Sequence, residues 1–268
     1  MKAVITCGGL GSRLLPFTKE LPKEMLPIFL KSENMIEAKP LIQLIFENLY
    51  DAGIRDFCFI TGKTKRSIEN HFTPDNENNK IMSSFYKKIK NSKIFWITQN
   101  EPKGFGDAVR YACSFVGNEK FILQAGDVAM INSLHNPIKE LTRLGGENFN
   151  AILIVREVSD PKRHGIVTLD NKNEKLTLVK SAIEKPESPL TNIGIMPIYL
   201  FNSKIFKYLH DIQLGKNNEV QLTDAIDKMI QEEGNVKAIK SDDKNFWDVG
   251  TPEAYWQALN ESYHYKNV

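Results

Sequence analysis

A glycine-rich segment near the N-terminus brings together residue types that can hold a polyphosphate. It follows directly after the apolar run 3–6 and consists of Gly8, Gly9, Leu10, Gly11, Ser12 and Arg13. Glycine lets the backbone approach a ligand and direct its N–H groups at phosphate oxygens, while arginine offers those oxygens a bidentate fork. Lys23 adds a point charge from the segment 21–27, which two prolines stiffen. The pattern predicts a phosphate-binding loop, and a plain glycine turn with solvated Arg13 and Lys23 is the competing interpretation.

Two widespread phosphate-binding motifs are absent from this segment. Leu14 stands where the dinucleotide fingerprint requires its third glycine. Ser12 is followed by Arg13, so no Gly-Lys-Ser/Thr triplet closes a P-loop. The segment therefore indicates a phosphate site of another kind.

Two aspartates far apart in the sequence are candidate metal ligands. Asp127 follows Gly126 and the apolar run 121–125, and ligands of open parallel sheets bind outside the carboxyl ends of the strands. Asp248 stands within the apolar run 246–249, where a carboxylate needs a counter-charge or a metal ion. Carboxylates together with substrate phosphates suit Mg²⁺. An aspartate that caps the next helix is the alternative for Asp127.

Two further groups could recognise a base and a sugar phosphate. Gln99 can both donate and accept hydrogen bonds, as the imide edge of a base requires, and the backbone of Gly104 follows it closely. Glu184 and Lys185 follow the β-type run 176–183, so the glutamate could bind sugar hydroxyls and the lysine a phosphate. A hydrophilic turn before a helix and a surface ion pair are the respective alternatives.

The composition excludes several classes of protein. Of 268 residues, 35 are basic and 33 acidic, so the broad basic surface of a nucleic-acid-binding protein is missing. Three dispersed cysteines argue against a disulfide framework. No apolar stretch approaches the length of a membrane span, and the first apolar run is too short for a signal peptide. We therefore expect a cytoplasmic protein without nucleic-acid or membrane partners.

The elements expected to position these residues alternate between strand and helix. Short apolar runs predict buried strands at 3–6, 57–61, 94–99 and 121–125, with helices at 41–50 and 106–115 between them. The segment 73–93 is predicted to be a surface excursion. Beyond residue 150 the pattern predicts an antiparallel or mixed layer and closing helices, at 151–155, 166–169, 176–184, 193–201, 222–232 and 252–260. A single α/β domain, residues 1–268, accounts for this order.

The ordered motifs resemble those of the sugar-phosphate nucleotidyltransferases, and most closely the UTP–glucose-1-phosphate uridylyltransferases. The resemblance covers nearly the whole chain and rests on segments 9–16, 22–27, 61–72, 102–108, 126–127, 184–186, 219–226 and 248–250. It implies a Rossmann-like three-layer α/β/α sandwich with a mixed, mostly parallel central sheet. It also implies a nucleotide-binding part at about 1–130 and a sugar-phosphate-binding part at about 131–268.

The resemblance also implies roles for individual residues. The catalytic group would be Arg13, Lys23, Asp127 and Lys185, and Mg²⁺ would be bound by Asp127 and Asp248. The nucleotide would contact Gly8, Gly9, Leu10, Gly11, Ser12, Gln99, Pro102, Gly104 and Gly126. The sugar phosphate would contact Gly165, Glu184, Lys185, Asn192 and Glu219.

The implied reaction joins UTP and glucose 1-phosphate to give UDP-glucose and pyrophosphate. Use of dTTP is the nearest alternative, because one methyl group separates the two bases, and a non-catalytic regulatory subunit is a further one. His164 departs from the tyrosine usual before Gly165, and Asn217 and Asn218 stand in a region where thymidylyltransferases carry an arginine. The family implies a homo-oligomer, either a dimer or a tetramer. Three aromatic residues near the C-terminus, Tyr255, Trp256 and Tyr263, could contribute to its interface or pack on their own domain.

Overall fold

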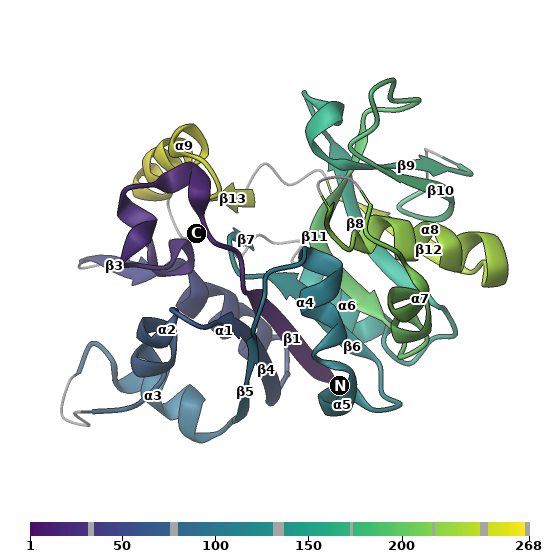
Figure 1. Ribbon diagram of the computed structural model, residues 1–268. Coiled ribbons are helices and arrows are strands. Elements are labelled where there is room, and N and C mark those ends of the chain that lie inside the picture. The colour runs from purple at the N-terminus through teal and green to yellow at the C-terminus, as the bar shows by residue number, and fades with distance from the viewer. Residues whose placement is uncertain are drawn as a thin grey trace.

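The computed structural model describes residues 1–31, 35–75, 80–130, 137–171, 174–215, 218–241 and 246–265. Its centre is a nine-stranded sheet in the order β5-β4-β1-β6-β11-β8-β12-β10-β9 (Figure 1). The strands are β1 (Lys2–Cys7), β4 (Asp56–Gly62), β5 (Lys93–Gln99), β6 (Phe121–Ala125), β8 (Ala151–Glu157), β9 (Gly165–Leu169), β10 (Leu176–Glu184), β11 (Ile193–Phe201) and β12 (Val236–Lys240).

The first half of the sheet is parallel. β1 lies between β4 and β6, β5 pairs with β4, and all of these pairings are parallel. β1 and β6 are buried nearly throughout, because helices cover both faces of the sheet. The strands predicted from the short apolar runs at 3–6, 57–61, 94–99 and 121–125 are confirmed.

The second half of the sheet is mixed. β11 runs antiparallel to both β6 and β8, and β10 runs antiparallel to β12 and β9. Because β12 is parallel to β8, the described strands of this nine-stranded sheet other than β11 and β10 share one direction. The predicted mixed, mostly parallel sheet is confirmed.

Helices cover the two faces of the sheet and enclose two cores. One core packs against α1 (Leu41–Asp51), α2 (Arg66–His71), α3 (Ser83–Lys90), α6 (Pro137–Leu144) and α9 (Pro252–His264). The other packs against α4 (Phe105–Arg110), α5 (Cys113–Val116), α7 (Ile205–Asp211) and α8 (Leu222–Glu233). Four short 3-10 helices complete the described helical elements: η1 (Ser12–Leu14), η2 (Phe17–Lys19), η3 (Lys23–Met25) and η4 (Pro161–Arg163). The result is the expected three-layer sandwich.

Two details of the helices differ from the sequence prediction. The single helix expected at 106–115 is interrupted, because the backbone N–H of Ala112 bonds to the carbonyl of Val109 in a tight turn between α4 and α5. The excursion at 73–93 contains α3, which buries Phe85 and Tyr86 against the core. The predicted start of α9 is confirmed, since the Thr251 hydroxyl caps it by accepting from the N–H of Ala254 at 3.2 Å.

Two small sheets lie beside the central one. β2 (Pro27–Lys31) and β3 (Ile36–Pro40) form a hairpin that packs under α9. β7 (Val128–Met130) pairs with β13 (Phe246–Asp248), with Asp248 opposite Val128. This second pairing places Asp127 and Asp248 side by side although 121 positions separate them.

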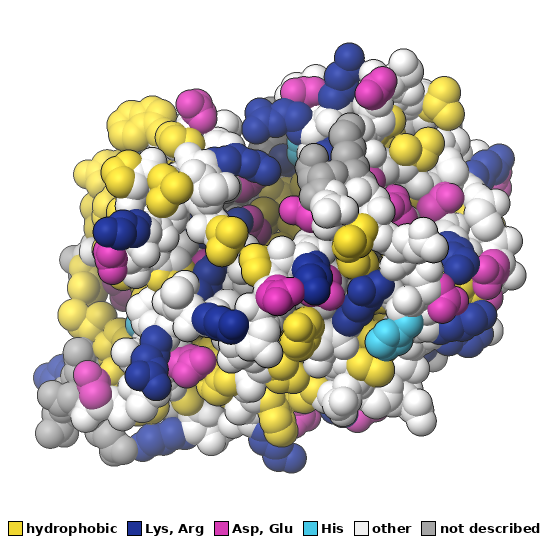
Figure 2. All heavy atoms as spheres, in the orientation of Figure 1, with side chains coloured by type: hydrophobic (Ala, Val, Ile, Leu, Met, Phe, Trp, Pro, Cys, Tyr) yellow, Lys and Arg dark blue, Asp and Glu magenta, His cyan; other side chains and the backbone are white. Residues whose placement is uncertain are grey.

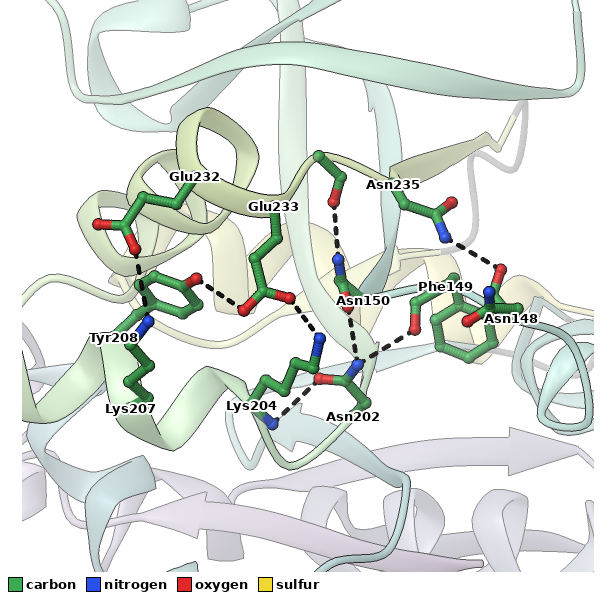
Figure 3. A network of polar contacts seen from close by, with 11 residues as sticks. Asn148, Phe149, Asn150, Asn202, Lys204, Lys207, Tyr208, Glu232, Glu233 and Asn235 are labelled. Atoms are coloured by element: carbon green, nitrogen blue, oxygen red, sulfur yellow. Dashed lines mark hydrogen bonds and ion pairs between the residues drawn. The ribbon is translucent and has the colours of Figure 1, made fainter.

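A polar network joins the helix pair α7 and α8 to the segments that flank β8 and β11 (Figure 3). Glu233 accepts from the Tyr208 hydroxyl at 2.9 Å and pairs with Lys204 at 2.5 Å. Asn150, just before β8, bonds to the carbonyl of Gly234 and to Asn202, just after β11. This network lies at the amino end of β8, opposite the carboxyl ends of the strands, where ligands of such sheets bind.

No helix in the described part of the chain is long and apolar enough to span a membrane.

Candidate active site

A cavity of about 550 Å³ opens at the carboxyl edge of the parallel strands. Figure 2 shows a hollow between the part that carries α9 and the part that carries β9 and β10, with charged side chains at its rim. Most of the predicted site residues line this cavity: Gly8, Gly9, Leu10, Ser12, Arg13, Lys23, Gln99, Pro102, Gly104, Asp127, Gly165, Glu184, Lys185, Glu219 and Asp248.

Three predicted site residues lie outside the cavity lining. Gly11 has a φ of 66° and its carbonyl accepts from the Thr18 hydroxyl at 2.7 Å, so it shapes the loop. A Cβ on Gly126 would lie 2.7 Å from the Cys7 sulfur, so this glycine lets the end of β6 approach β1. Asn192 is exposed just before β11, and its role in sugar binding stays a prediction.

Lys23 and Asp127 form an ion pair at the centre of the cavity. The Lys23 Nζ lies 2.5 Å from the Asp127 Oδ2, and both side chains are mostly buried. Burial alone would raise the pKa of Asp127, but the Lys23 ammonium outweighs it and holds this pKa below its ordinary value. Burial likewise opposes the charge of Lys23, yet Asp127 raises the pKa of the lysine. Both groups are therefore charged at neutral pH.

Asp248 faces this pair from the β13 strand. Its Oδ1 accepts from the N–H of Gly250 at 2.6 Å, and the N–H of Val249 bonds to the carbonyl of Asp127. Solvent reaches Asp248 although many protein atoms surround it. Desolvation raises its pKa, and the neighbouring Asp127 carboxylate raises it further. A cation between the two carboxylates would relieve this repulsion.

A second, more deeply buried ion pair holds η3, the element that carries Lys23. The Lys65 Nζ lies 2.8 Å from each oxygen of Glu24, and both side chains are almost completely buried. Glu24 follows Lys23 in η3, and Lys65 precedes α2, so the pair fixes η3 against the end of β4. No local pattern in the sequence marks these two charges, which lie 41 residues apart, as partners.

Gln99 is held in one orientation at the end of β5. Its Nε2 donates to the Asp107 Oδ2 at 2.7 Å, and the Asp107 Oδ1 lies 3.7 Å from Arg110. The Gln99 Oε1 is packed so closely over Gly8 that a Cβ there would overlap it. Gly104 has a φ of 102°, and a Cβ there would lie 2.8 Å from the Val220 carbonyl oxygen. The segment 99–104 is thus fixed by close backbone approach.

The opposite wall of the cavity comes from β9, β10 and α8. The Lys185 Nζ lies 3.1 Å from the Glu184 Oε1, and the Thr223 hydroxyl donates to the Glu184 Oε2 at 2.6 Å. A Cβ on Gly165 would lie 2.8 Å from the Thr223 hydroxyl oxygen. Thr223 was not predicted, since a hydroxyl in the first turn of a helix carries no distinctive signal. Asn217 lies outside the described residues.

The carboxylate pair suits a hard divalent cation. Asp127 and Asp248 offer oxygen ligands only, and the described residues contain no cluster of three or more acidic, cysteine or histidine side chains that would complete a protein-made cage. Mg²⁺ is commonly held in this way, by one or two carboxylates with substrate phosphates and water as the other ligands. The donor set therefore fits Mg²⁺.

The comparison with known families decides the class of the chain. The sequence model of the nucleotidyl transferase family matches residues 2–264. The chain belongs to this family. A relative from Staphylococcus epidermidis, named UTP–glucose-1-phosphate uridylyltransferase, is 39% identical over 85% of this chain and 81% of its own. A relative of the same name from Bacillus subtilis is 37% identical over 85% and 80%.

Solved structures of this family superpose on the chain. A UDP-glucose pyrophosphorylase complexed with UDP-glucose is 30% identical, with a TM-score of 0.88 over 98% of each chain. A UTP-bound enzyme of the same kind from Acinetobacter baumannii is 26% identical, with a TM-score of 0.79 over 97% of this nucleotidyltransferase and 92% of the other. The predicted fold and enzyme class are confirmed.

Proposed function

We propose that this nucleotidyltransferase transfers the uridylyl group of UTP to glucose 1-phosphate, with release of pyrophosphate. The observation that carries the proposal is one cavity in which a glycine loop with Arg13 and Lys23 faces Glu184 and Lys185 across two carboxylates. The names of the relatives, which act on UTP and glucose 1-phosphate or bind UDP-glucose, support the choice of substrates.

The nucleotide occupies the half of the cavity that is lined by the residues following β1 and β5. Arg13 and Lys23 bind the β- and γ-phosphates, which leave together as pyrophosphate, and Gln99 with Gly104 binds the uracil edge. Asp107 and Gly8 support this assignment, because they hold the Gln99 amide in a fixed orientation before the base arrives. Such preorganisation lowers the entropic cost of binding.

The sugar phosphate occupies the half of the cavity that is lined by Gly165 of β9 and Glu184 of β10. Glu184 accepts hydrogen bonds from sugar hydroxyls, and Lys185 binds the phosphate. Thr223 orients Glu184, and the missing side chain of Gly165 leaves room beside it. Glu219 lines the same wall.

The proposed chemistry is an in-line displacement at the α-phosphorus of UTP. An oxygen of the sugar phosphate forms a new P–O bond as the bond to the β-phosphate breaks. The attacking group is already an anion, so no protein nucleophile is needed. The task of the protein is to hold two anions together and to stabilise charge on the leaving group. Mg²⁺ bound by Asp127 and Asp248 would neutralise charge on the reacting phosphates.

A panel of four nucleoside triphosphates against several sugar 1-phosphates tests the proposal. Purified protein with Mg²⁺ should release pyrophosphate fastest with UTP and glucose 1-phosphate. Appreciable turnover of dTTP would fit a pocket in which one methyl group is worth about 1–3 kcal/mol. No turnover with any pair would favour a non-catalytic nucleotide-sugar-binding subunit instead.

The same proposal includes a homo-oligomer. Trp256 and Tyr263 on α9 expose 70% and 50% of their surfaces, and they lie two turns apart on the same face of the helix. Sedimentation equilibrium of the wild type and of Trp256→Ser should show a dimer or tetramer that the substitution weakens. A wild-type monomer at micromolar concentration would exclude it.

A further inference from the structure

Arg156 is a half-buried cation for which the sequence pattern indicates no role. It is the sixth residue of β8, whose side chains alternate between the two faces of the sheet. Ile152 and Ile154 pack into the core that contains α1 and α9, and Arg156 continues their row. Arg156 is the third residue of this row and lies beyond the core, where its side chain forms part of the cavity lining.

The surroundings of Arg156 hold it in place but leave donors unused. Its guanidinium carbon lies 5.2 Å from the centre of the Phe246 ring, within the range of a cation–π contact. Its Nε is fully buried and has no hydrogen-bond partner among the described residues. Asp248 and Glu261 are the acidic groups whose charge acts on it, and none of the described acidic side chains lies within ion-pair distance of it.

The other cations of the cavity are placed differently. Lys23 is paired with Asp127 at 2.5 Å, and Lys185 with Glu184 at 3.1 Å. Arg13, at the glycine loop, and Arg163, just before β9, also line the cavity and are exposed. A half-buried guanidinium that lines a substrate cavity, with a buried Nε–H that no described residue accepts, is suited to an anion that arrives with the substrate.

The strand order indicates which of the two substrates carries the anion that Arg156 could bind. The glycine loop and Gln99 follow β1 and β5, on the near side of β6. β8 lies beyond β11, on the side of β10 and β9, which carry Glu184 and Gly165. We propose that Arg156 binds the phosphate of the sugar 1-phosphate, from the β13 side of the cavity and opposite Lys185. This inference rests on the proposed function.

The test separates the two substrates kinetically. Arg156→Gln should raise the KM for glucose 1-phosphate at least tenfold and leave the KM for UTP within twofold. Arg156→Lys keeps the charge but loses the planar fork, so its KM for glucose 1-phosphate should lie between those of the wild type and Arg156→Gln. Lys240→Gln is the matched control, because Lys240 pairs with the neighbouring Glu157 at 3.0 Å and does not line the cavity. It should leave both KM values unchanged.

The split between the KM values distinguishes binding from a structural role. If Arg156 acted only by supporting Phe246 and Asp248, Arg156→Gln would raise the KM for UTP and the Mg²⁺ requirement as strongly as the KM for glucose 1-phosphate, and the inference would be overturned. Unchanged KM values in an active variant would also overturn it. If Arg156→Gln does not fold, Arg156→Lys decides by the same criterion. A wild-type protein without uridylyltransferase activity overturns the proposed function and this inference together.

Discussion

Lys23→Met is the substitution that probes the phosphate loop most sharply. Methionine keeps the length of the side chain but removes the ammonium that lies 2.5 Å from Asp127. The loop itself should persist, because the buried pair of Glu24 and Lys65 fixes η3 independently. The variant therefore isolates the contribution of one charge.

The expected loss follows from the charge that gathers on the leaving pyrophosphate. A unit charge about 4 Å from a phosphate, at an effective dielectric constant of about 20, interacts with it by roughly 4 kcal/mol. Because about one further negative charge develops on the leaving group during the reaction, roughly 3–4 kcal/mol of transition-state stabilisation depends on Lys23. This corresponds to a decrease in kcat of about 10²–10³-fold.

The assay is pyrophosphate release at saturating UTP, Mg²⁺ and glucose 1-phosphate. Lys19→Met is the matched control, since Lys19 lies four residues earlier in the same segment, is 77% exposed and should be dispensable. Lys23→Met should also shift the acidic limb of the pH–rate profile to higher pH. The pKa of Asp127 is held down by Lys23, and burial would raise it in the variant. A folded Lys23→Met variant with kcat within fivefold of wild type would exclude Lys23 from the stabilisation of the leaving pyrophosphate.

Three further changes test the supporting structure. Glu24→Gln leaves the ammonium of Lys65 buried and unpaired, so urea unfolding should show a loss of about 3–5 kcal/mol, most of which the added change Lys65→Met should restore. Gly104→Ala places a Cβ 2.8 Å from the Val220 carbonyl oxygen at a φ of 102°, and it should cost about 1–3 kcal/mol and raise the KM for UTP. Burial lowers the pKa of His71 from 6.5. Because the unfolded chain then binds the proton first, stability should fall below about pH 6.5, by at most about 1.4 kcal/mol per pH unit, and His71→Asn should remove this slope.

The sequence predicted those parts of the fold in which local pattern and tertiary position agree. The parallel strands are buried on both faces, so their continuous apolar runs identify them directly. The strands β7 and β13 have three residues each, too few for any periodicity. β12 reads Val-Lys-Ala-Ile-Lys, and its lysines conceal a central strand. Short or charge-bearing strands are assigned only by their neighbours in the sheet.

The sequence predicted those site residues that lie within one recognisable local motif. The glycine loop, Asp127 and Lys185 each follow a recognisable strand. Glu24 and Asp107 could not be assigned, because each acts by fixing a partner that only the folded chain brings near. Arg156 follows the apolar residues of β8, so the sequence pattern indicates only the exposed end of a strand. The structure shows that its side chain lines the cavity.

The fate of the individual phosphates of UTP distinguishes uridylyl transfer from hydrolysis of the γ-phosphate. UTP labelled with ³²P at the α-phosphate, or at the γ-phosphate, is incubated with the protein, Mg²⁺ and glucose 1-phosphate, and the products are separated by chromatography. We expect the α-label to enter UDP-glucose and the γ-label to enter pyrophosphate, and Asp127→Asn to form little of either. Release of the γ-label as inorganic phosphate, or UDP-glucose formation undiminished in Asp127→Asn, would contradict it.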